Sequence, residues 1–133
     1  MKVEGQCHCG HISFEAEIDP NMVRICHCTD CQTLSGSAYR VNVPASAASF
    51  RLLTGQPKIY IKTAESGNPR AQAFCPNCAS SIYSAGTRDT PTYVLRVGTL
   101  KQRAQLQPSL QIWSRSAQPW VSDLRHVQQV ECQ

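Results

Sequence analysis

Seven of the eight cysteines lie in three short clusters whose spacing is typical of metal ligands. The clusters are Cys7-His8-Cys9, Cys26-His27-Cys28-Thr29-Asp30-Cys31 and Cys75-Pro76-Asn77-Cys78. A tetrahedral zinc site takes four soft ligands, and two short knuckles can each supply a pair of thiolates. Cys-x-x-Cys is the usual knuckle spacing, and the side chains of a Cys-x-Cys pair on an extended chain project to the same side. We therefore expect a closed structural zinc site formed by Cys7, Cys9, Cys75 and Cys78.

The cluster of Cys26, Cys28 and Cys31 has no obvious fourth partner. Three protein ligands leave one tetrahedral position for water or a substrate, which is the pattern of a reactive zinc. Such a zinc binds an incoming thiol as thiolate and polarises a carbonyl. We therefore expect two Zn²⁺ ions per chain, one structural and one catalytic. Two alternatives stay open: a closed second site completed by His27, His8 or Cys132, and a redox dithiol at Cys28 and Cys31.

Length and composition predict one domain over residues 1–133, because 133 residues with 41% hydrophobic content can bury one modest core. No apolar run is long enough for a membrane helix or a signal peptide, so we expect a cytoplasmic protein with reduced thiols rather than a disulfide framework. The net charge of +4 falls to +1 when seven thiolates and two Zn²⁺ ions are included. The basic residues are scattered, so neither a nucleic acid nor a membrane is an expected partner.

The alternation of apolar and polar residues over 11–18 predicts a half-buried strand. Weaker alternation predicts further strands, separated by turn residues, and the whole pattern indicates a mainly β fold with little helix. Unpaired strand edges are compatible with a homodimer. The further strands are expected at 23–26, 39–43, 50–53, 59–62, 73–75, 80–84, 93–97 and 111–114, and the short helices at 29–34 and 122–129.

Three motifs, in this order, resemble the glutathione-dependent formaldehyde-activating enzyme (GFA) family, which includes centromere protein V. They are Gly5-Gln6-Cys7-His8-Cys9-Gly10, then Cys26-His27-Cys28-Thr29-Asp30-Cys31-Gln32, then Phe74-Cys75-Pro76-Asn77-Cys78. The resemblance implies a β-tent fold of packed antiparallel sheets. It also implies that Cys7, Cys9, Cys75 and Cys78 hold the structural zinc, and that Cys26, Cys28 and Cys31 hold the catalytic zinc.

The resemblance further implies a carbon–sulfur lyase similar to S-(hydroxymethyl)glutathione synthase. Its substrate would be a small thiol or thiol–aldehyde adduct of the glutathione type. The alternative from another class is a non-catalytic zinc-binding interaction module. One departure from the family pattern is Ala79, which stands where the family usually has glycine.

Several other residues have two possible interpretations, one functional and one structural. The Ser35-Gly36-Ser37 loop is either part of the reactive site or an ordinary turn. Trp113 and Trp120 are expected to pack in the core or at its rim rather than to contact a substrate. Each of four basic residues could meet a carboxylate of a peptide-like thiol, but a solvated surface position is expected for each of them: Arg40, Lys62, Arg70 and Arg96.

Overall fold

Ten strands form two sheets in the computed structural model, which describes all 133 residues and has 39% of them in strands. The smaller sheet has the order β1 (Lys2–Gln6), β2 (Ser13–Glu17), β5 (Arg51–Thr54). The larger sheet has the order β10 (Leu110–Ile112), β3 (Arg24–Cys26), β4 (Arg40–Ser46), β9 (Thr92–Arg96), β8 (Ser81–Gly86), β7 (Pro69–Phe74), β6 (Lys58–Thr63). All neighbours pair antiparallel except β10 and β3, which pair parallel. The expected mainly β fold is confirmed.

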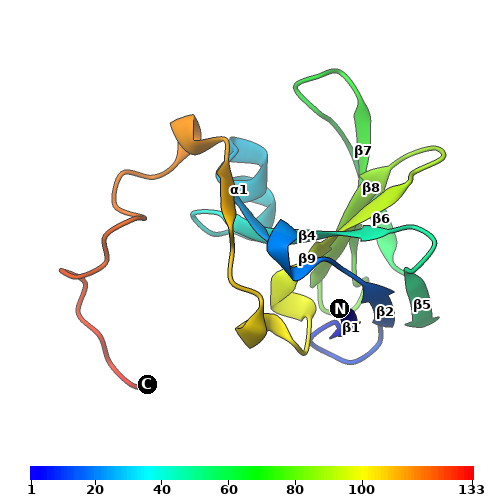
Figure 1. Ribbon diagram of the computed structural model, residues 1–133, viewed down its shortest axis with the longest axis horizontal. Helices are drawn as coiled ribbons and strands as arrows, with labels where there is room; N and C mark the ends of the chain where they lie inside the picture. Colours follow the sequence, from blue (N-terminus) through cyan, green and yellow to red (C-terminus); the bar gives the residue numbers. More distant parts are fainter.

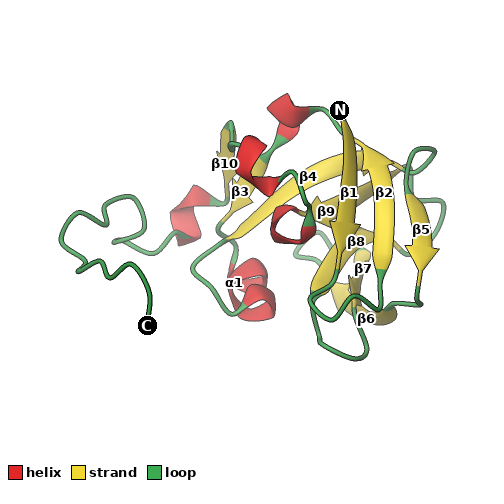
Figure 2. Cartoon of the chain, turned by 90° about the horizontal axis from the view of Figure 1, so that it is seen from below, coloured by secondary structure: helices red, strands yellow, loops and turns green.

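The core lies between the two sheets, which face each other in Figure 2. Val3 and Phe14 from the smaller sheet are fully buried, as are Val43 and Leu95 from the larger one. An isolated bridge between Ile18 and Ala45 joins the sheets where the connection from β2 begins. Because side chains alternate along a strand, the residues next to Val43 and Leu95 project from the opposite face of the larger sheet. That opposite face carries the candidate site.

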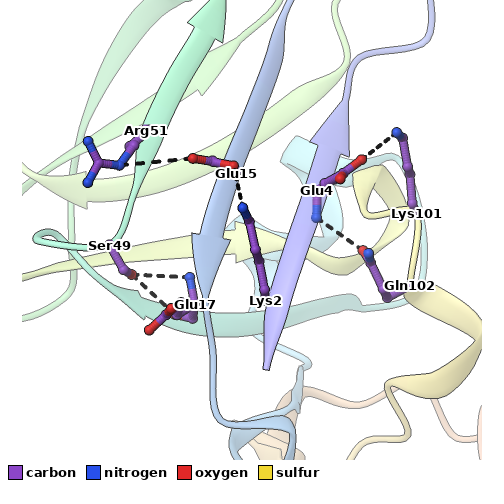
Figure 3. Close-up of polar contacts among 8 residues, drawn as sticks. All are labelled: Lys2, Glu4, Glu15, Glu17, Ser49, Arg51, Lys101 and Gln102. Atoms are coloured by element: carbon purple, nitrogen blue, oxygen red, sulfur yellow. Dashed lines mark hydrogen bonds and ion pairs between the residues drawn. The ribbon is translucent and has the colours of Figure 1, made fainter.

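The outer face of the smaller sheet is polar and solvated. Lys2 and Arg51 both pair with Glu15, at 3.0 and 3.9 Å, and Lys101 pairs with Glu4 (Figure 3). At least one side chain of each pair is largely exposed, so these ion pairs contribute little to stability.

Helical structure is sparse. The turn expected at residues 29–34 is confirmed as α1 (Thr29–Ser35), and Gly36 ends it in the left-handed conformation. No helix in the structure has the length and apolar character needed to cross a membrane. The remaining helical segments are short 3-10 turns: η1 (Pro20–Met22), η2 (Val97–Thr99), η3 (Arg103–Gln105) and η4 (Ser114–Ser116).

The helix expected at residues 122–129 is wrong. These residues form only turns and irregular chain, and the C-terminal segment leads away from the body of the molecule (Figure 1). Every residue from 122 to 133 is exposed, so no packing partner is present to stabilise so short a helix.

Candidate metal centres and the adjoining cavity

The four sulfurs of Cys7, Cys9, Cys75 and Cys78 lie within 4.8 Å of one another. The first pair sits in the turn between β1 and β2, and the second pair sits in the turn between β7 and β8. The Sγ atoms of Cys7 and Cys9 are 3.6 Å apart, and those of Cys9 and Cys75 are 3.8 Å apart. This four-cysteine group therefore joins a turn of the smaller sheet to a turn of the larger one.

Hydrogen bonds hold both knuckles of the four-cysteine group. The backbone N–H of Ile12 donates to Cys7 Sγ at 3.2 Å, and Ala79 N–H donates to the Cys75 carbonyl at 2.9 Å. The hydroxyl of Ser80 lies 3.2 Å from Cys78 Sγ and accepts a bond from the N–H of His8. The contact with Ser80 lowers the pKa of Cys78 to about 5, which favours the thiolate that a metal requires.

The sulfurs of Cys26, Cys28 and Cys31 also lie within 4.8 Å of one another. Cys26 ends β3, Cys28 is the N-cap of α1, and Cys31 lies in the first turn of that helix. The Sγ atoms of Cys26 and Cys28 are 3.5 Å apart, and Cys28 Sγ accepts the backbone N–H of Cys31 at 3.3 Å. The end of a strand and the start of a helix thus gather this three-cysteine group within six residues.

None of the residues considered as a fourth ligand belongs to the three-cysteine group. His27 points elsewhere: its ring is buried, and its Nε2 atom is hydrogen-bonded to Gln111 Oε1 at 2.7 Å. His8 lies in the other knuckle, and Cys132 is exposed in the C-terminal segment. All eight cysteines are free thiols, so the structure contains no disulfide framework.

The geometry of both groups suits zinc. Sulfurs at the usual 2.3 Å from a tetrahedral zinc are separated by about 3.8 Å, close to the Sγ–Sγ separations of 3.5 to 3.8 Å in the two groups. The hydrogen bond from the Cys31 thiol lowers the pKa of Cys26 to about 5, and the same contact raises the pKa of Cys31. Without a cation the group therefore resists full deprotonation, because three thiolates so close together repel one another. A divalent cation would remove that repulsion.

A cavity of about 420 Å³ opens beside the three-cysteine group, on the face of the larger sheet that points away from the core. α1 and the segment after β10 complete its wall. The four-cysteine group does not line it. The lining side chains that carry charge or sulfur are Arg24, Cys26, Cys28, Asp30, Cys31, Arg40, Lys62, Glu65, Arg70, Arg96 and Arg115.

Two of the arginines expected at the surface are buried, so that expectation is wrong for Arg40 and Arg96, which are each 6% exposed. Burial lowers the pKa of Arg96 to about 9, and the charge of Arg40 acts in the same direction, so Arg96 keeps its charge at neutral pH. Sequence reasoning also missed the neutral residues that bind these arginines, Asn42 and Gln72. Alternation along the strands could have indicated these residues. Asn42 and Arg96 are next to Val43 and Leu95 in the sequence, so they lie on the face of the sheet opposite to the core.

The remaining candidates divide between the cavity and the surface. Trp113 lies at the cavity rim with the guanidinium of Arg115 4.9 Å from its ring centre, whereas Trp120 is 56% exposed and packs in no core. The Ser35-Gly36-Ser37 loop does not line the cavity. Ser35 Oγ donates to the Cys31 carbonyl at 2.6 Å, and Gly36 caps α1. The loop is thus the turn that ends this helix.

Comparison with known proteins bears on the fold and the family of the chain. A crystal structure of a Rhodobacter sphaeroides protein superposes with a TM-score of 0.62 at 18% identity, over 81% of this chain and 98% of that one, which supports the fold. A relative from Halomonas elongata, described as a putative glutathione-dependent formaldehyde-activating enzyme, is 31% identical over 88 residues. That match covers 62% of this chain and 55% of the relative, so the chain spans about half of the relative's length. The model of the glutathione-dependent formaldehyde-activating enzyme family matches residues 2–116, and the chain belongs to that family.

Proposed function

We propose that the protein is a zinc-dependent carbon–sulfur lyase acting on a small thiol–aldehyde adduct at Cys26, Cys28 and Cys31. The observation that carries this proposal is that the three-cysteine group, and not the four-cysteine group, lines the cavity. A closed set of four ligands has no position for a substrate, whereas a set of three has one. Membership of the family supports the reaction class.

A zinc ion held by the three thiolates would supply one open coordination position, at which a thiol loses its proton more readily. In the forward direction the thiol sulfur bonds to the aldehyde carbon, and the carbonyl π bond opens. The carbonyl oxygen takes up the proton that the thiol releases, and cleavage reverses each change. Lys62, ion-paired with Asp30 beside Cys31, lines the cavity and offers an N–H donor to the negative charge that develops on this oxygen.

In this proposal the second zinc is structural and is bound by Cys7, Cys9, Cys75 and Cys78. Residues 1–133 then form a single zinc-binding domain that works in the reducing cytoplasm, where these thiols stay free. The substrate is a small molecule of the glutathione type, since the family name points to a thiol partner. A homodimer is compatible with the exposed edge strand β6 but is not required by the mechanism.

Metal content tests the division of roles. Elemental analysis should find two zinc ions per native chain. Cys28→Ser should keep one zinc and stay folded, because its site lies at the edge of one sheet. Cys75→Ser should lose the structural zinc and unfold, because Cys75 is fully buried and its group joins the two sheets. Cys132→Ser, which changes an exposed cysteine outside both groups, is the control and should keep two.

Two results would contradict the lyase proposal. One is a native protein with a single zinc that Cys28→Ser does not remove. The other is a Co²⁺-substituted second site whose absorption spectrum does not change with any thiol or thiol adduct. A fourth protein ligand on the second zinc would favour the non-catalytic interaction module instead.

A further inference from the structure

A buried polar layer forms the floor of the cavity. Asn42 on β4 and Arg96 on β9 are cross-strand partners, and Arg40 lies two residues before Asn42 on the same face of the sheet. Arg96 Nη1 donates to Asn42 Oδ1 at 2.6 Å, and Arg96 Nη2 donates to Gln72 Oε1 at 2.9 Å. Arg40 Nη1 donates to the same Gln72 oxygen at 3.4 Å. Two buried guanidinium groups therefore share one amide acceptor.

Neither buried arginine has an acidic partner. The hydrogen-bond acceptors of Arg40 and Arg96 are neutral amide and hydroxyl oxygens, and Arg40 Nη2 is buried with no acceptor at all. The two acidic residues that line the cavity, Asp30 and Glu65, are already ion-paired with other side chains. Buried charges are normally paired because desolvation is costly. The cavity floor thus holds two positive charges that a bound anion would compensate.

The metal centre compensates for only part of this charge. Three thiolates around a divalent cation carry one net negative charge, and a bound substrate thiolate adds a second. Six basic and two acidic side chains line the cavity, which leaves a surplus of four positive charges. This surplus exceeds the two negative charges of the metal centre and the substrate thiolate. A ligand with a further negative group would be favoured by the remaining charge.

The position of that negative group follows from the strand register. Arg40 lies directly opposite Cys26 in the β3–β4 pair, so both side chains leave the same face of the sheet from backbones about 5 Å apart. Both line the same cavity. A ligand whose sulfur lies beside Cys26 can therefore place an anionic group against Arg40 through a short chain of bonds.

We propose that Arg40 and Arg96 form a carboxylate subsite, and that the preferred ligands are short thiol carboxylates and their aldehyde adducts. The planar guanidinium fork of Arg40 binds a carboxylate with charge-assisted hydrogen bonds. Gln72, which Arg96 holds by a hydrogen bond, accepts a bond from that fork and orients it. This inference rests on the proposed function, because it takes the sulfur of the ligand to lie at the three-cysteine group.

The test compares mercaptoacetate with 2-mercaptoethanol, which has a hydroxymethyl group in place of the carboxylate. Each is titrated into the Co²⁺-substituted protein, and binding is followed by the cobalt absorption spectrum. We expect mercaptoacetate to bind at least about tenfold more tightly, as charge-assisted hydrogen bonds would give. Glutathione is titrated in parallel and should bind more weakly than mercaptoacetate, because its carboxylates lie further from the sulfur.

Variants distinguish binding at the carboxylate subsite from a general effect of the protein's positive charge. Arg40→Gln should abolish the preference for mercaptoacetate, and Arg40→Lys should keep part of it because the charge remains. Arg51→Gln removes an exposed arginine of the smaller sheet and should leave the preference unchanged. A preference that is absent in the unmodified protein, or that persists in Arg40→Gln, would overturn the subsite while leaving the lyase proposal intact.

The two proposals can fail separately. If neither thiol changes the cobalt spectrum, the lyase proposal fails. Glycolate, which has a carboxylate and no sulfur, is then titrated by calorimetry into the zinc-loaded protein. Binding that disappears in Arg40→Gln would support the anion subsite by itself, and no binding would overturn it.

Discussion

Ala79 holds a backbone conformation that glycine adopts more easily. Its φ is +61°, in the left-handed region where a Cβ atom costs about 1 kcal/mol relative to glycine. Alanine at this position therefore leaves strain in the knuckle of Cys75 and Cys78. We expect Ala79→Gly to raise the free energy of unfolding by about 0.5 to 1 kcal/mol. Urea denaturation of the metal-loaded protein measures this difference.

Two matched substitutions control for the flexibility that glycine adds to the unfolded chain. Ala48 is exposed in a turn and has no positive φ, so Ala48→Gly should lower stability slightly. Gly36 has a φ of +63° with open space around its Cα, so Gly36→Ala should lower stability by about 1 kcal/mol through backbone strain. If Ala79→Gly behaves like Ala48→Gly, the strain at Ala79 is absent.

At the scale of single residues, the sequence predicted the grouping of the cysteines but not the burial of the arginines. Ligand pairs are read from local spacing, and Cys26, Cys28 and Cys31 come together within one strand end and one helical turn. The burial of Arg40 depends instead on non-local strand pairing, which sets it opposite Cys26 on β3 and within reach of Gln72 on β7. Composition alone favours the surface for any arginine, so the strand order was needed to correct the expectation.

Among the elements, β1 depends on a glycine that leaves room for an aromatic ring. Gly5 lies opposite Phe14 on β2, and the Phe14 ring covers the Gly5 Cα. A Cβ atom at Gly5 would lie 2.0 Å from Phe14 Cζ, and Phe14 is fully buried. Gly5→Ala must displace this ring, so we expect a loss of about 1 to 3 kcal/mol in the free energy of unfolding. Thermal and urea denaturation would both report it.

Gly98 provides the control for this prediction. It has no positive φ, and no atom lies within 4 Å of an added Cβ, so Gly98→Ala should change stability by less than about 0.5 kcal/mol. A Gly5→Ala protein as stable as Gly98→Ala would mean that the Phe14 ring moves aside without cost.

The same glycine explains why alternation did not predict β1. The inward positions of Lys2–Gln6 are Val3 and Gly5, so a single apolar side chain marks the buried face. The ring of Phe14 supplies the missing apolar surface from the neighbouring strand, which no local pattern in β1 reveals. The strand β2, which alternation did predict, carries its own apolar side chains on the buried face, Phe14 and Ala16.

At the scale of the whole molecule, the two sulfur groups differ in the parts of the chain that they join. The four-cysteine group joins two turns that are distant in sequence, one from each sheet. The three-cysteine group uses neighbouring residues at one end of the larger sheet and leaves the rest of that sheet face for the cavity. Strands of the larger sheet therefore position the residues of the cavity floor, and the three-cysteine group beside the cavity does not join the two sheets.

The exposed C-terminal segment gives a prediction about the extent of the cooperative unit. Every residue of 122–133 is exposed, and the hydrogen bonds within this segment are local. Deleting 122–133 should therefore shift the thermal midpoint by no more than about 2 °C and leave the metal content unchanged. Deleting 117–133 also removes Gln118, whose Nε2 donates to Gln32 Oε1 on α1 at 2.8 Å. This longer deletion should therefore lower the free energy of unfolding by about 0.5 to 1.5 kcal/mol. Calorimetry of both deletions checks this, and equal destabilisation would show that residues 122–133 belong to the folded unit.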